Sequence, residues 1–270
     1  MVNFQCKEFY DYTDLLQIMK CLRSPGGCPW DREQTHSSIR RNLLEETYET
    51  VDAIDRGDSV DLCEELGDVL MQVVFHAAME EEAGRFAMAD VVNGVCQKLV
   101  FRHPHVFGTV DVHGSSDEVL VNWEALKRRE KGQSSTADAV EAVAHTLPAL
   151  WRAEKIQSKA AKAGFEWTDK LSALDKLEEE VDELRRAVES GAGVDVPHGI
   201  REEAGDVLFV AAKVAQAAGV DPEDALHRAC DKFTRRYRLV EEGAGRPLSD
   251  YTQEELIALW KQAKEQDNQS

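Results

Sequence analysis

The stretch IREEAGDVLFVAA, residues 200–212, carries two acidic residues at the beginning of an otherwise apolar run. Glu203 and Asp206 are three positions apart, so in a helix they lie on the same face. The four residues that follow Asp206 are apolar, and a carboxylate beside a buried core is costly unless it is paired or binds a metal ion. The stretch therefore predicts a core-packed helix whose two acids have a specific partner.

Apolar residues elsewhere in the chain recur with the period of a helix. One such stripe consists of Leu174, Leu177, Val181, Leu184 and Val188. Only seven residues are proline, and alternation typical of strands is hard to find. We therefore expect an all-α protein with helices near 11–22, 38–56, 58–82, 87–102, 116–131, 146–163, 170–190, 198–218, 221–241 and 252–266.

The composition excludes several classes of protein. A chain of 270 residues that is 43% hydrophobic and 31% charged can build a packed core. It has no apolar run near the roughly 20 residues of a membrane helix, and its polar beginning is unlike a signal peptide. Six cysteines without a C-x-x-C pair indicate reduced thiols, so we expect a cytoplasmic protein. A net charge of −19 argues against duplex nucleic acid as a partner but is compatible with a small polyphosphate.

One unit of more than a hundred residues occurs twice in the chain. CEELGDVLMQVV at 63–74 resembles REEAGDVLFVAA at 201–212, and LLEETYE at 43–49 resembles KLEEEVDE at 176–183. Such a long period indicates duplication of a whole helical unit and not a solenoid. We expect two tandem domains of four to five helices each, an N-terminal domain over 1–131 and a C-terminal domain over 146–270. The small, polar segment 132–145 is the predicted linker.

Each half carries the pattern E-E-x-x-E on one predicted helix and E-x-x-D on the next. Two antiparallel helices joined by a loop would bring these acidic faces together, and such a cluster repels itself unless a cation is present. Mg²⁺ prefers oxygen ligands, whereas zinc and di-iron sites favour histidine, which neither pattern contains. We therefore expect a Mg²⁺ site, with Mn²⁺ as the substitute ion. The candidate metal ligands are Glu45, Glu46, Glu49, Glu65 and Asp68 in the first half, and Glu179, Glu180, Glu183, Glu203 and Asp206 in the second.

Cations and aromatic residues near such a cluster would make it a nucleotide site. Lys232 and Arg236 share a helix face and could contact phosphate oxygens, although ion pairs with acids of their own helix are the alternative. Lys155 and Lys159 lie along another helix face. Trp260 could stack on a base or pack in the core. The corresponding residues of the first half are Lys98, Arg102 and Trp123.

The order of the motifs resembles the MazG family of nucleoside triphosphate pyrophosphohydrolases in its two-domain form, over nearly the whole chain. The motifs are GCPWDREQT, LLEETYE, EELGDVL and RHPHVFG, then EEEVDEL, EEAGDVLF and KFTRRYR with a later tryptophan. The resemblance implies an all-α fold completed by dimerisation, hence a homodimer. It also implies Mg²⁺-dependent hydrolysis of a nucleoside triphosphate to the monophosphate and diphosphate, by attack of water at the α-phosphorus. Such an activity would sanitise or regulate nucleotide pools.

The resemblance also assigns roles to individual residues. The second-half acids Glu180, Glu183, Glu203 and Asp206 would be catalytic, and we expect this half to be the main site. It places Lys232 and Arg236 near the phosphates and Trp260 on the base, and we add Lys155, Lys159 and Trp167, with Lys98, Arg102 and Trp123 in the first half, as candidate substrate-binding residues. Two alternatives remain: a non-catalytic acidic helical protein that binds or regulates a partner, and a dUTP or phosphoribosyl-ATP hydrolase of the same superfamily.

Overall fold

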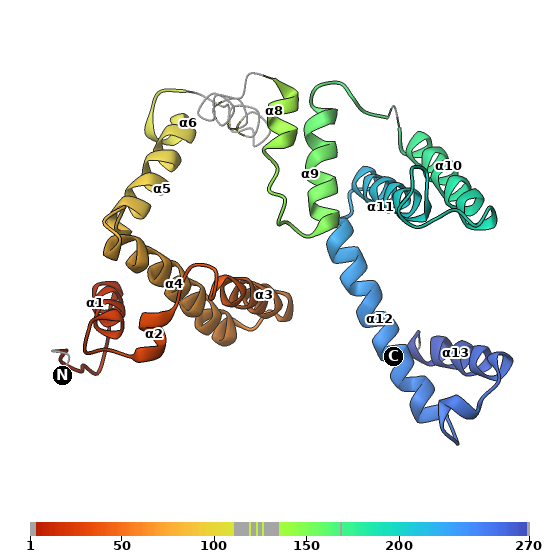
Figure 1. Cartoon of the computed structure of the whole chain (residues 1–270), viewed down its shortest axis with the longest axis horizontal. Coiled ribbons are helices and arrows are strands. Elements are labelled where there is room, and N and C mark those ends of the chain that lie inside the picture. Colours follow the sequence, from red (N-terminus) through yellow and green to blue (C-terminus); the bar gives the residue numbers. More distant parts are fainter. Residues whose placement is uncertain are drawn as a thin grey trace. The chain divides into compact units, whose positions relative to one another are not determined.

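The computed structural model describes residues 4–110, 119, 123, 126, 135–167 and 169–268, which form helices and turns without a strand (Figure 1). The predicted all-α class is therefore confirmed. The chain divides into two compact units, Met1–Lys127 and Arg128–Ser270. None of the described helices has the length and hydrophobicity needed to span a lipid bilayer.

The first unit is organised around its longest helix, α4, against which α1, α3 and α5 pack. Its buried core consists of Met19, Ile39, Val74, Phe75, Ala78 and Met79, so it lies mainly between α1 and α4. The described helices of this unit are α1 (Tyr12–Arg23), α2 (Pro29–Glu33), α3 (Arg40–Arg56), α4 (Ser59–Glu82), α5 (Met88–Arg102) and α6 (Pro104–Phe107).

A two-residue turn joins α3 to α4 and makes them an antiparallel pair. Gly57 ends α3 with φ of 68°, in the left-handed region that glycine adopts without steric cost. Asp58 then caps α4, because its carboxylate accepts hydrogen bonds from the backbone N–H groups of Val60 and Asp61. The short turn keeps the two helices in contact, so the acidic face of α3 lies opposite that of α4.

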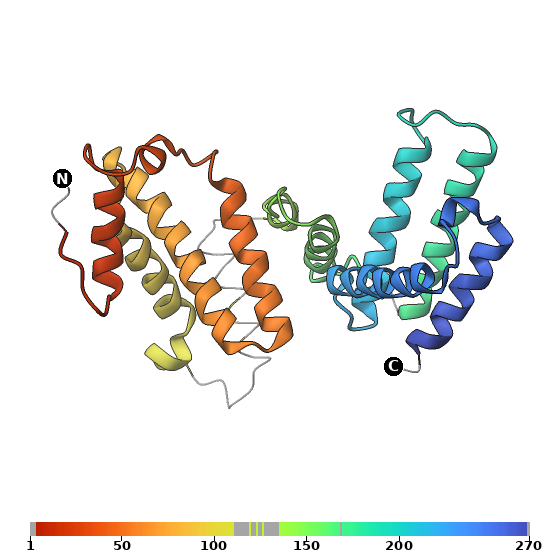
Figure 2. The same ribbon diagram turned by 90° about the horizontal axis from the view of Figure 1, so that it is seen from below.

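The second unit contains a similar antiparallel pair, α10 and α11, and a second pair, α12 and α13 (Figure 2). The connection between α10 and α11 spans residues 190–199 and is longer than its counterpart in the first unit. Helix α9 packs against both α11 and α12. The elements are α8 (Thr136–Glu141), α9 (Ala149–Ala161), α10 (Lys170–Glu189), α11 (Ile200–Ala217), α12 (Pro222–Gly243), a 3₁₀ turn (Leu248–Asp250) and α13 (Gln253–Asp267).

Nine of the ten predicted helices are present, with each end within three residues of the expected position. The tenth, 116–131, lies outside the described residues apart from 119, 123 and 126. The short helices α2, α6 and α8 were not predicted, because they are too short to show an apolar period. Helix α8 lies inside the predicted linker 132–145, where Ala139 and Val143 are buried.

The predicted apolar stripe of α10 is only partly covered within its unit. Leu174 is 42% exposed and Val188 is 56% exposed. On α11, Leu208 is 58% exposed, and Phe209 is also classed as exposed. The α10–α11 pair therefore leaves apolar side chains uncovered within its own unit.

Candidate functional site

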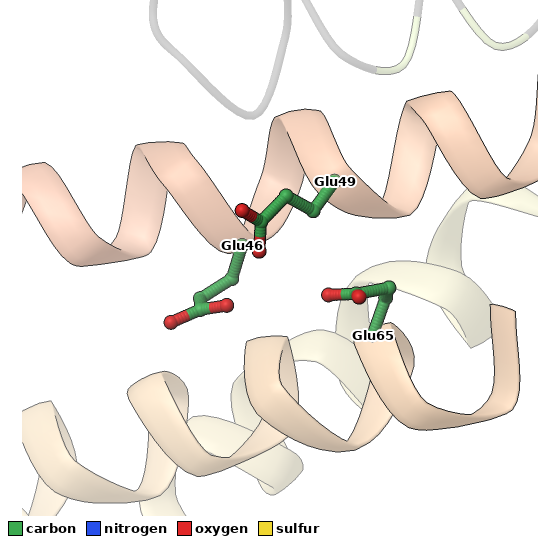
Figure 3. A group of neighbouring side chains, drawn as sticks. All are labelled: Glu46, Glu49 and Glu65. Atoms are coloured by element: carbon green, nitrogen blue, oxygen red, sulfur yellow. The ribbon is translucent and has the colours of Figure 1, made fainter. Parts of the chain in front are cut away.

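Three carboxylates meet on the antiparallel pair of the first unit. Glu46 and Glu49 project from α3 and Glu65 from α4, and an oxygen of each lies within 4.8 Å of the others (Figure 3). Burial raises the pKa of Glu46, with further contributions from the charges of Asp68 and Glu49. Burial and the charge of Glu49 likewise raise the pKa of Glu65. Without a cation, this group is therefore held together against its own repulsion.

Within the described part of the first unit, two buried side-chain oxygens have no hydrogen-bond partner. They are Oε2 of Glu65, within the carboxylate group, and Oε1 of Gln72, two turns further along α4. Buried polar atoms are rarely left unsatisfied in folded proteins. We therefore expect Oε2 of Glu65 to contact a cation or a water molecule. A divalent ion that prefers oxygen donors matches the donor set of this group.

The second unit brings together Glu180 of α10 with Glu203 and Asp206 of α11, again with oxygens within 4.8 Å. Glu180 and Glu203 are buried, whereas Asp206 is exposed. Partial desolvation and the neighbouring charge of Glu180 raise the pKa of Asp206. The acids of residues 200–212 thus lie opposite an acid of α10, as the helical spacing indicated.

The second group differs from the first because a lysine ammonium lies beside its acids. Nζ of Lys176 lies 2.8 Å from a carboxylate oxygen of Glu180, and Nδ1 of His198 lies 3.7 Å from one of Glu203. Hydrogen bonds to Glu180 and Glu179 raise the pKa of Lys176, so its ammonium stays protonated. Asn42 occupies the position of the first repeat that corresponds to Lys176. Among the described residues, the three acids of the first group form no ion pair.

Three of the predicted metal ligands form ion pairs and are not among the acids whose oxygens meet. Glu45 lies 2.8 Å from Arg41, Glu179 lies 3.0 Å from Lys176, and Glu183 lies 3.3 Å from Arg186. Asp68 is half-buried beside the first group, where its charge acts on Glu46 and Glu65. Sequence reasoning missed Lys176, although its spacing of four from Glu180 is the signal of a helical ion pair.

The nucleotide-contacting residues predicted for the second repeat lie on α12 and α13. Lys232 is exposed on α12. On α13, the ring of Trp260 packs against that of Phe233, with 5.1 Å between the ring centroids. Arg236 is mostly buried and donates from Nε to Oδ2 of Asp267 at 2.7 Å. Figure 1 shows that α12 leads away from α10 and α11 and that α13 packs along its far part. The acids lie on the α10–α11 pair, whereas these residues lie on the α12–α13 pair.

The first repeat arranges the corresponding residues differently. Lys98 is exposed on α5, and the guanidinium carbon of Arg102 lies 5.4 Å from the ring centroid of Trp123. The ring of His103 meets the same indole edge-on at 4.8 Å. A cation over an indole face is a favourable contact, so Arg102 covers the aromatic surface on which a base would stack.

The remaining predicted residues lie on or after α9. Lys155 is exposed, while Lys159 and Trp167 are half-buried. Next to Trp167, the carboxylate of Glu166 lies 3.0 Å from Nζ of Lys213, which is only 4% exposed on α11. The sequence pattern did not identify this buried lysine, which occupies a position where the first repeat has the core residue Phe75.

Comparisons with known proteins agree with this two-part organisation. The family model described as the MazG nucleotide pyrophosphohydrolase domain matches residues 34–107 and 168–240, and these segments contain both carboxylate groups. A nucleoside triphosphate pyrophosphohydrolase of Escherichia coli (strain K12) is 43% identical over 261 residues, which cover 94% of this chain and 97% of that protein. The nucleoside triphosphate pyrophosphohydrolase/pyrophosphatase MazG of Thermotoga maritima is 41% identical over 256 residues, covering 94% and 95%.

Proposed function

Because the chain belongs to the MazG family of nucleotide pyrophosphohydrolases, we propose that it hydrolyses nucleoside triphosphates to the monophosphate and diphosphate. The observation that carries this proposal is the pair of three-carboxylate groups, one in each family segment and each on an antiparallel helix pair. The role would be to sanitise or regulate nucleotide pools in the cytoplasm.

The metal ligands proposed are Glu46, Glu49 and Glu65 in the first repeat and Glu180, Glu203 and Asp206 in the second. The all-oxygen donor set suits Mg²⁺, with Mn²⁺ as a substitute. When bound, such an ion neutralises phosphate charge and lowers the pKa of bound water.

The remaining steps of the proposed reaction are assigned to residues of the second repeat. Water would attack the α-phosphorus while the bond from that phosphorus to the bridging oxygen breaks, and diphosphate leaves with that oxygen. A carboxylate of the group would orient the water or take up its proton. Lys176, Lys232 and Arg236 would bind phosphate oxygens, and Trp260 would stack on the base.

Two features support a homodimer as the working form. Lys232, Arg236 and Trp260 lie on the α12–α13 pair and not on the α10–α11 pair that carries the acids, and the α10–α11 pair exposes apolar residues such as Leu174 and Leu208. A second copy that covers this apolar surface could also supply the missing half of the site. The domain limits proposed remain 1–131 and 146–270, joined by the segment 132–145.

The second repeat is proposed as the main catalytic site. The protonated Lys176 lies beside its acids and would supply the positive charge that a triphosphate needs. In the first repeat, by contrast, Arg102 lies over the ring of Trp123, on which a base would stack. The first group, with no cation of its own in the described structure, would still bind a metal ion.

The test is a panel of ordinary and modified nucleoside triphosphates with Mg²⁺, given to the full chain and to Glu65→Gln and Glu203→Gln. We expect diphosphate release to persist in Glu65→Gln and to fall at least 100-fold in Glu203→Gln. The reverse pattern would move catalysis to the first repeat. Turnover of dUTP or phosphoribosyl-ATP alone would establish a specialised hydrolase, and the absence of any turnover would favour a binding protein.

A further inference from the structure

The carboxylate of Asp267, at the end of α13, is shared by two consecutive arginines of α12. It accepts a hydrogen bond from Nε of Arg236 at 2.7 Å and from Nε of Arg235 at 3.1 Å. The side chains of Asp267 and Arg236 are 10% and 15% exposed, whereas that of Arg235 is 61% exposed. The pair with Arg236 is therefore shielded from water, and the pair with Arg235 is a surface contact of the kind that contributes little.

The buried pair sets the orientation of the Arg236 guanidinium. Asp267 engages Nε, and Nη2 lies 3.3 Å from Oδ1 of Asn268, so two sides of the planar group are held by the end of α13. A guanidinium carries five donors in one rigid plane, and fixing Nε therefore fixes the direction of the terminal nitrogens. An arginine ordered before its ligand arrives loses less conformational entropy on binding.

The two repeats show what an arginine at this position does in each environment. In the first repeat, Arg102 lies over the ring of Trp123. In the second repeat, the contacts of Arg236 are with Asp267 and Asn268, and the aromatic neighbour of Trp260 is Phe233. The guanidinium of Arg236 is thus engaged by the carboxylate of Asp267, whereas that of Arg102 lies over an indole ring.

We propose that Asp267 is a positioning residue of the second repeat, which orients Arg236 toward the phosphates of the nucleotide and leaves the indole of Trp260 to the base. The proposal rests on the proposed function, in which Arg236 and Trp260 contact the substrate. The simpler alternative is that Asp267 only fastens α13 to α12. The two roles predict different effects on ligand binding. If Asp267 only fastens α13 to α12, removing Arg235 or Arg236 would have the same effect.

The experiment measures binding of two probes to the full chain in the presence of Mg²⁺ by isothermal titration calorimetry. The probes are adenosine 5′-(α,β-methylene)triphosphate, which resists cleavage at the α-phosphorus, and inorganic tripolyphosphate, which has no base. We expect Asp267→Ala to raise the Kd of both probes roughly tenfold, and Asp267→Glu, which keeps the carboxylate, to restore most of the affinity. Arg235→Ala is the matched control, because it removes the other partner of the same carboxylate, and it should bind like the wild type.

A second comparison separates positioning from folding. In an Arg236→Ala background, Asp267→Ala should cause no further loss, because the residue through which it acts is gone. The positioning role is overturned if Asp267→Ala binds both probes normally, if Arg235→Ala loses as much affinity, or if the loss persists without Arg236. Should Asp267→Ala not fold, Asp267→Asn decides the matter, with an intermediate Kd expected and a wild-type Kd contradicting the role. If Arg236→Ala itself binds tripolyphosphate normally, the phosphate assignment made in the proposed function fails.

Discussion

Mg²⁺ should stabilise the folded protein through the two carboxylate groups, and the size of the effect follows from mass action. An ion at 100 times its Kd that binds only the folded state adds about 2.7 kcal/mol to the free energy of unfolding. The first unit, Met1–Lys127, has 127 residues, and a unit of this size unfolds with an entropy near 0.27 kcal/mol per kelvin. The midpoint of unfolding of this unit should therefore rise by roughly 10 °C.

The assay is differential scanning calorimetry over a series of Mg²⁺ concentrations. Glu65→Gln should abolish the rise in the unfolding midpoint of the first unit. Adding Glu203→Gln should abolish the rise in the unfolding midpoint of the second unit. Glu45→Gln is the control, because its carboxylate is paired with Arg41 outside the group, and it should keep the full rise. If the double variant responds to Mg²⁺ as the wild type does, the two groups are not metal sites.

Three further predictions concern catalysis, acid stability and assembly. Asp206→Asn should lower the rate of diphosphate release by at least 100-fold while leaving the helix content unchanged by circular dichroism; full turnover would contradict the site. The hydrogen bond from Arg85 lowers the pKa of Glu80 to about 2, so its stabilising contribution is present above pH 4.5 and is lost as the pH falls toward 2. The difference in Tm between the wild type and Glu80→Gln should accordingly shrink across that window, and a constant difference would refute this. Leu208→Asp should convert the proposed dimer to a monomer in size-exclusion chromatography with light scattering, because it charges an exposed apolar face; a dimeric mass for the variant would place the interface elsewhere.

The positions of the acids could be predicted from the sequence because helical spacing alone decides which residues share a face. Glu203 and Asp206 lie three apart, and the repeat identified Glu65 and Asp68 as their counterparts. Which acids meet could not be predicted in the same way. Glu183 pairs with Arg186 and is not part of the second group, whereas the first repeat has Asp52 in place of that arginine and Glu49 belongs to its group.

The limits of the fold prediction also have physical causes. An apolar period identifies a face that avoids water, but it does not say whether the same chain or a second copy covers it, as with Leu174 and Val188. Helix α8 is too short for a period, although Ser135 and Asp138 form a capping box that marks its beginning. The pairing of Arg236 with Asp267 joins residues 31 positions apart, beyond the reach of any local pattern.

The most direct test of the central claim is hydrolysis of a nucleoside triphosphate by the full chain in water enriched in ¹⁸O, with Mg²⁺ present and the products analysed by mass spectrometry. Attack at the α-phosphorus predicts nucleoside monophosphate and diphosphate as the products, with one ¹⁸O atom in the monophosphate and none in the diphosphate. Label in the diphosphate, or release of nucleoside diphosphate and orthophosphate, would contradict it.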